Sequence, residues 1–163
     1  MTLMLGACVS APTVSTPLAS SPAPSETITI SVGPCFGFCP VYTASFASDG
    51  TARFFGQRHT AVLGERAKDA GAEAYRELAR DLAVFQPATG AEAAIECTAA
   101  ISDTSEYTVT WTGANGRKTV ATVPSGCPGG PGNTLVRILR DVPKRLGIED
   151  WTKQTTRPGE SRG

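Results

Sequence analysis

Four of the five cysteines in this 163-residue chain restrict its fold more than any other feature: Cys35, Cys39, Cys97 and Cys127. In an oxidising compartment, an even set of this kind is typical of two disulfides, and three pairings are conceivable. In an extended strand Cys35 and Cys39 would lie about 13 Å apart. They can therefore bond only across a bend that brings their Cα atoms to roughly 4.4–6.8 Å. Gly37 and the flanking prolines allow this bend, so we favour Cys35–Cys39 with Cys97–Cys127, and the other pairings stay open.

The fifth cysteine ends the sequence Leu5-Gly6-Ala7-Cys8, which resembles the lipobox of bacterial lipoproteins. In that motif small residues admit the signal peptidase, and the cysteine thiol accepts a diacylglycerol. Few residues precede the motif here, whereas a signal peptide has a basic start and an apolar stretch of roughly 7–15 residues. We therefore expect residues 1–8 to be a truncated-looking lipoprotein signal that is lipidated on Cys8. The resemblance implies a protein of the bacterial cell envelope, attached to the membrane by its lipid and facing the periplasm.

Residues 9–25 have the composition of a disordered tether. Fourteen of these seventeen residues are Ser, Pro, Ala or Thr, and none is charged. Such a segment buries too little apolar surface to offset its ordering entropy, and it would let a domain float roughly 20–50 Å from its anchor. Residues 152–163 are polar and aperiodic, which predicts a disordered tail. Between tether and tail we expect one domain, residues 26–151.

The domain opens with segments that have the pattern of β-strands. Apolar and polar residues alternate over residues 27–32, as in a half-buried strand. Residues 41–46 and 51–55, joined through Asp49-Gly50, predict a β-hairpin. Residues 107–123 predict a second hairpin, because two alternating segments flank a turn that contains glycine and asparagine.

Apolar residues recur at helical spacing in two other segments. Residues 72–85 predict an amphipathic helix that Pro87 ends. A second helix is expected to begin after an N-cap at Asn133 or Thr134 and to be broken by Pro143. The residues expected to be buried on these helices are Tyr75, Leu78, Ala79, Leu82, Leu135, Ile138, Leu139 and Val142. These segments predict a disulfide-bonded α+β fold, an antiparallel sheet of about five strands with two helices packed on one face.

Composition and motifs argue against several classes of function. Fifteen basic and fifteen acidic residues leave no net charge, so a nucleic-acid partner is not expected. No apolar run reaches the roughly 18 residues of a membrane span. A zinc site usually presents two close pairs of ligands, whereas Cys97 and Cys127 are isolated and His59 is the single histidine. Because no nucleophile motif of the G-x-S-x-G type is present either, we expect no catalytic residues, no metal and no cofactor.

The cysteine-containing motif resembles that of a known bacterial family. The motif is Cys35-x-Gly37-x-Cys39-Pro40-x-Tyr42, followed by Asp49-Gly50, a central helix, Cys97, Ser102-Asp103-Thr104 and a late Cys127. It is similar to the family catalogued as domain of unknown function 6438, over residues 27–151. The resemblance implies an exported or lipid-anchored bacterial domain and supplies no catalytic residues.

One functional hypothesis assigns redox chemistry to Cys35 and Cys39. Closely spaced thiols can exchange disulfides when neighbouring groups lower their pKa. Thioredoxin-like motifs, however, place two residues between the cysteines, at the start of a helix. Here three residues lie between them, with strands predicted on both sides, so we favour a structural disulfide.

The other hypothesis is a non-enzymatic envelope protein that binds through a loop formed by Phe36, Gly37, Phe38 and Tyr42. Two aromatic rings on a bent loop can serve as a recognition anchor, because buried aromatics dominate many interfaces. The rings can equally pack against the edge of the sheet, and the sequence leaves both readings open. The expected partner is an unidentified envelope protein or component, and the oligomeric state is not predicted.

Overall fold

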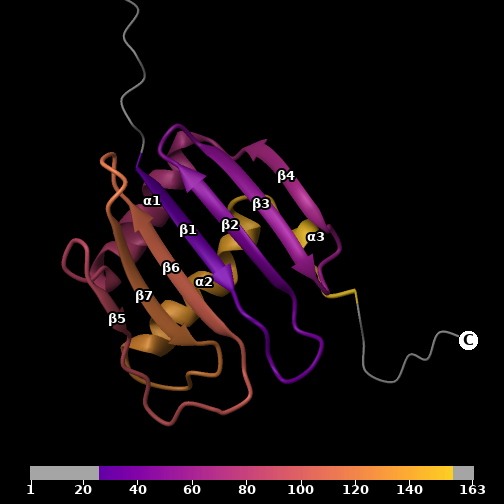
Figure 1. Cartoon of the computed structure of the whole chain (residues 1–163), viewed down its shortest axis with the longest axis vertical. Helices are drawn as coiled ribbons and strands as arrows, with labels where there is room; N and C mark the ends of the chain where they lie inside the picture. Colours follow the sequence, from indigo (N-terminus) through magenta and orange to yellow (C-terminus); the bar gives the residue numbers. More distant parts are fainter. Residues whose placement is uncertain (1–25, 156–163) are drawn as a thin grey trace, which may run out of the picture.

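A seven-stranded sheet carries its helices on one face in the computed structural model, which describes residues 26–155 (Figure 1). The strands are β1 Thr27–Val32, β2 Val41–Ala47, β3 Thr51–Arg58, β4 Gly64–Asp69, β5 Glu92–Ala94, β6 Glu106–Thr112 and β7 Lys118–Pro124. The helices are α1 Ala72–Leu82, continued by the 3₁₀ turn η1 Ala83–Phe85, then α2 Pro131–Arg145 and α3 Glu149–Thr152. The lipobox with Cys8, the tether at residues 9–25 and the tail beyond Thr155 lie outside the described residues.

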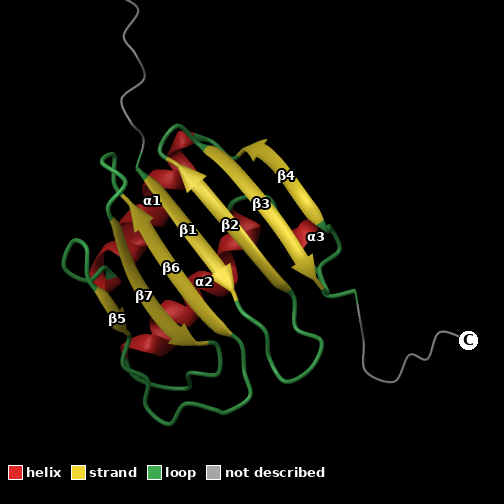
Figure 2. Cartoon of the chain, in the orientation of Figure 1, coloured by secondary structure: helices red, strands yellow, loops and turns green. Residues whose placement is uncertain are grey.

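The strands follow the order β4-β3-β2-β1-β6-β7-β5, and every neighbouring pair is antiparallel except β5 with β7. Strand β1 lies near the middle of the sheet, between β2 and β6. It therefore joins the amino-terminal hairpin to the carboxy-terminal hairpin. Figure 2 shows the consequence: α1 and α2 lie behind the sheet, and its other face is open.

The core lies between the sheet and the helices. On β1 the side chains of Ile28 and Ile30 are buried, whereas Thr27 and Thr29 on the open face are half-buried. This is the alternation that the sequence predicts for a strand with one covered face. Six of the eight residues predicted for the helical stripes are buried: Tyr75, Leu78, Leu82, Leu135, Leu139 and Val142. The other two, Ala79 and Ile138, pack against the core as partly buried residues.

The α+β class is confirmed, but the prediction of about five antiparallel strands is wrong. Strand β4 was missed because it has no apolar alternation: most of its side chains are exposed and charged, as suits the edge of a sheet. Strand β5 was missed because it has three residues, all exposed. Its pairing with β7 is parallel, so the sheet is mixed.

The second helix begins earlier and ends later than predicted. Its N-cap is Gly130 and Pro131 occupies the first turn, where the missing N–H costs nothing, so Asn133 and Thr134 lie inside the helix. Pro143 does not break it, because Pro143 lies in the last turn and the helix continues to Arg145. A short third helix, α3, was not predicted.

Contacts of the described chain continue past Trp151 to Thr155. The indole ring of Trp151 packs against Phe54 with ring centroids 5.8 Å apart. Gln154 forms a β-bridge with Thr60, and the backbone N–H of Thr155 donates to the carbonyl of His59. These contacts hold the last described residues beside the segment that follows β3.

Candidate functional site

The β1–β2 connection is bent by the first disulfide. The Cα atoms of Cys35 and Cys39 lie 5.8 Å apart, inside the range that a disulfide requires. Between them the N–H of Gly37 donates to the carbonyl of Cys35 at 2.9 Å. Gly37 has φ 147°, a backbone conformation that other residues rarely adopt. The glycine and the disulfide together make the tight bend that the spacing requires.

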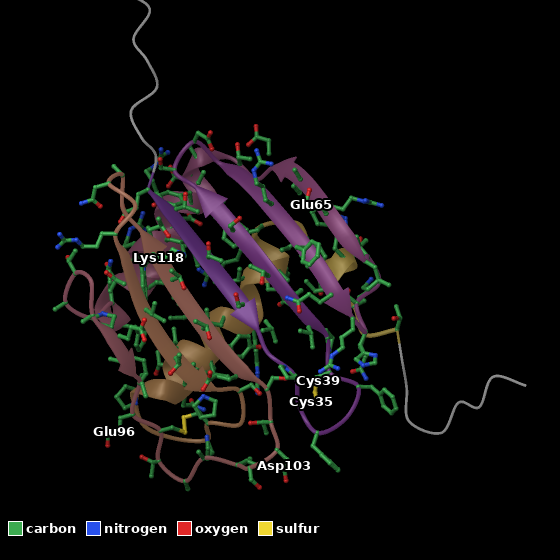
Figure 3. All side chains as sticks on the ribbon, in the orientation of Figure 1. Cys35, Cys39, Glu65, Glu96, Asp103 and Lys118 are labelled. Atoms are coloured by element: carbon green, nitrogen blue, oxygen red, sulfur yellow. A yellow bond between two sulfur atoms is a disulfide. The ribbon has the colours of Figure 1, made fainter. Side chains whose placement is uncertain are left out.

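The base of this loop is fixed to the second half of the domain. The N–H of Gly33 donates to the carbonyl of Glu106 at 2.9 Å, and the N–H of Phe36 donates to the carbonyl of Asp103 at 3.1 Å. Figure 3 shows Cys35, Cys39 and Asp103 at the same end of the domain. The loop is thus held by a covalent bond inside it and by hydrogen bonds to residues that are distant in the sequence.

The two loop phenylalanines have different surroundings. Phe36 is 90% exposed, whereas Phe38 is 40% exposed and packs edge-on against His59 with ring centroids 5.4 Å apart. Phe38 therefore fastens the loop to the residue that follows β3. Phe36 does not pack against the sheet edge, so its ring is presented to the surroundings.

The third aromatic residue assigned to the loop, Tyr42, lies in the core. It is 8% exposed, and its ring packs against Phe54 with centroids 5.3 Å apart. Tyr42 and Tyr107 both pair with Val32, from opposite sides of β1, so the two rings lie in one row near the disulfide loop. Burial raises the pKa of both phenols, and the proximity of Tyr107 raises that of Tyr42 further.

A pocket of about 300 Å³, with both polar and apolar lining residues, opens at the surface at this end of the domain, between the sheet and α2. Cys39 and Tyr42 line one part of it, and Tyr107 and Arg140 line another. Arg140 donates to the carbonyl of Ser125 at 2.8 Å and interacts with the hydroxyl of Tyr107, which opposes the rise in the pKa of that phenol. Tyr107 and Arg140 could not be grouped from the sequence, because they lie on different elements, β6 and α2, that only the folded domain brings to one pocket.

The second disulfide lies at the same end of the sheet and joins the β5–β6 connection to the β7–α2 connection. The Cα atoms of Cys97 and Cys127 lie 5.6 Å apart. Cys127 is 4% exposed, and its carbonyl accepts a hydrogen bond from the Asn133 side chain at 2.9 Å. The structure thus contains the two cysteine pairs that the spacing favours.

One known family matches most of the chain. The family model described as a domain of unknown function (DUF6438) matches residues 26–136, from the start of β1 into α2. The chain belongs to this family. The match covers all seven strands and all four cysteines that form disulfides in this DUF6438 domain. No curated protein and no solved structure matches the chain.

Two structural findings bear on the chemistry of this DUF6438 domain. Within residues 26–155, no three side chains of the types His, Cys, Asp and Glu are grouped so that they can hold a metal ion. Over the same residues, no helix has the length and hydrophobicity needed to cross a bilayer. The candidate site consists of the exposed ring of Phe36, the disulfide loop and the pocket beside it.

Proposed function

We propose that this DUF6438 protein is a lipoprotein of the bacterial cell envelope whose domain binds an envelope protein through the Cys35–Cys39 loop. The observation that carries the proposal is the exposure of Phe36 on a loop that a disulfide holds in one conformation. A large apolar ring on a rigid loop loses little conformational entropy when a partner covers it. Aromatic residues of this kind are frequent among those that dominate binding energy.

The anchor is supported by the sequence rather than by the described structure. Cys8 and the uncharged tether suit a domain that is held at a membrane but separated from it. The two disulfides suit an oxidising compartment outside the cytoplasm.

Crosslinking in the native envelope tests the contact at Phe36. A photoreactive phenylalanine at position 36 is expected to form a discrete covalent adduct with a partner protein, identified by mass spectrometry. The matched control is the same residue at position 84, because Val84 is 82% exposed and lies on η1, away from the loop. Adducts of equal yield at both positions, or none at position 36, contradict the proposal.

The Phe36→Ala variant separates binding from stability. The free energy of unfolding is expected to change by less than about 0.5 kcal/mol, because the exposed ring has few contacts to lose. Affinity for the partner captured by crosslinking is expected to fall by about 2 kcal/mol, roughly thirtyfold. Urea unfolding and a binding titration measure the two quantities. Unchanged affinity would exclude Phe36 as an anchor.

Lipidation of Cys8 is tested in the native host. The mature protein is expected to begin at Cys8 and to carry a mass increase corresponding to a diacylglycerol and any further acyl chain. The variant Cys8→Ser is expected to move from the membrane fraction to the soluble fraction. A mature protein with an unmodified Cys8 contradicts the anchor and leaves the loop proposal standing.

The rival function, a thiol–disulfide redox domain that uses Cys35 and Cys39, has less support. Thioredoxin-like domains place two residues between the reactive cysteines, at the start of a helix. Three residues separate Cys35 from Cys39, and the pair lies between two strands, β1 and β2. The geometry therefore favours a bond that shapes the loop.

A further inference from the structure

We propose that the pocket beside the disulfide loop is a binding site for a carboxylate, with Arg140 as the residue that recognises its charge. The pocket has a volume of about 300 Å³, at the lower end of the range for ligand sites. It therefore suits a small acid or the carboxylate end of a larger molecule.

Arg140 is the one charged residue among those that line the pocket, and no carboxylate lines it. Among residues 26–155, the observed ion pairs use Arg76, Arg145 and Lys153 as the cations. The partners of Arg140 are neutral: the carbonyl of Ser125 and the hydroxyl of Tyr107. Its positive charge is thus available to an anion that enters the pocket.

Residues that carry hydroxyl groups line the same pocket. Tyr42 and Tyr107 line the pocket, together with Ser105 and Ser125. A phenol has an ordinary pKa of about 10, and burial raises the pKa of both tyrosines further. Both hydroxyls are therefore protonated near pH 7 and can donate hydrogen bonds. A carboxylate accepts through two oxygens, and hydrogen bonds to an ionised acceptor are stronger than neutral ones. The pocket therefore offers one cation and several neutral donors to a group that carries one negative charge.

One guanidinium with several neutral hydroxyl donors suits a carboxylate better than a phosphate. A phosphate ester carries close to two negative charges near pH 7, and a single guanidinium leaves part of that charge unpaired. A guanidinium matches a carboxylate in geometry as well as in charge, because two parallel N–H groups meet two oxygens.

The pocket does not require the contact proposed for Phe36. Cys39 lines the pocket, but Phe36 does not. A partner bound at Phe36 can place an acidic group in the pocket, or a free acid can bind there alone. Separate variants can therefore test the two sites.

The test is an NMR titration of the ¹⁵N-labelled domain at constant ionic strength. The probe is N-acetylalanine, whose carboxylate is ionised near pH 7. N-acetylalaninamide and inorganic phosphate are the comparison ligands. N-acetylalanine is expected to shift the backbone amide signals of Ser105, Tyr107 and Arg140, with weaker or no shifts from the amide and from phosphate. No saturable shift at these residues, equal shifts with the amide, or tighter binding of phosphate would overturn the proposal.

Three variants assign the effect to the pocket. Arg140→Gln is expected to weaken binding of N-acetylalanine at least tenfold, and Tyr107→Phe about threefold to tenfold, since the ring is kept and the donor is lost. Arg137→Gln is the matched control, because Arg137 lies on the same helix but outside the pocket lining. It is expected to bind N-acetylalanine as the unmodified domain does. If Arg137→Gln weakened binding as much as Arg140→Gln, the effect would come from the net charge of the domain and not from the pocket, and the assignment would be overturned. If Arg140→Gln does not fold, as its NMR spectrum would show, Tyr107→Phe still tests the pocket. Phe36→Ala is expected to leave N-acetylalanine binding unchanged.

Discussion

Removal of the Cys97–Cys127 disulfide is expected to lower the free energy of unfolding by about 3.5 kcal/mol. The bond closes a loop with a sequence separation of 30 residues, and in the chain-entropy model a crosslink of this length restricts the unfolded chain by about that amount. The variant is Cys97→Ser with Cys127→Ala, which places no hydroxyl at the buried position 127. Urea unfolding of the oxidised proteins measures the difference.

The matched control is the double variant Cys35→Ser with Cys39→Ser. This bond closes a loop with a separation of only 4 residues, so its loss is expected to cost about 2 kcal/mol. A larger loss at Cys35–Cys39 than at Cys97–Cys127 would contradict the assignment of the longer loop as the main covalent contribution to stability.

Substitution of Gly56 by alanine is expected to destabilise the domain by about 3 kcal/mol, the upper end of the usual cost of overpacking. Gly56 lies on the buried face of β3, where the chain that follows the strand folds back over it. A Cβ atom at this position would lie 1.9 Å from the carbonyl oxygen of Val62 and 2.6 Å from the hydroxyl of Thr60. The first of these atoms is backbone, so the segment between β3 and β4 must move.

Gly33→Ala is the control for this steric effect. A Cβ atom on Gly33 would be 3.5 Å from its nearest neighbour, an ordinary contact. Its expected cost is below about 1 kcal/mol. Thermal or urea unfolding of both variants checks the comparison, and equal costs would show that backbone entropy rather than the close approach at Gly56 decides the effect.

The parts of the fold that were predicted correctly are those where one face of an element is buried. In β1 and in α1, burial imposes a period on the apolar residues, and that period is visible in the sequence. Strand β4 has polar residues on both faces because it is an edge strand, so its sequence carries no such period. The start of α2 was misplaced because Pro131 fills the first turn, and polar Asn133 and Thr134 resembled an N-cap.

The candidate site was predictable in part. The spacing of Cys35 and Cys39 around Gly37 indicated a bent loop, and the structure has it. Tyr42 was assigned to the loop surface, although its alternation with the following strand residues places it in the core. The pocket with Tyr107 and Arg140 could not be predicted, because it depends on which strands are neighbours and on where α2 packs, and no local sequence pattern gives either.

The position of β1 between two hairpins determines the order in which its two edges can pair. One edge of β1 pairs with β2, the next strand in the sequence. Its other edge can pair only after β6 is available, and β6 starts roughly 75 residues later. If the chain folds as it is synthesised, amino terminus first at about 5–20 residues per second, that edge stays unpaired for roughly 4–15 s. An open strand edge is a place where chains pair wrongly. A chaperone that binds the unfolded chain during synthesis would therefore protect β1 in particular from pairing with other chains. That protection would no longer be needed once β6 pairs with β1.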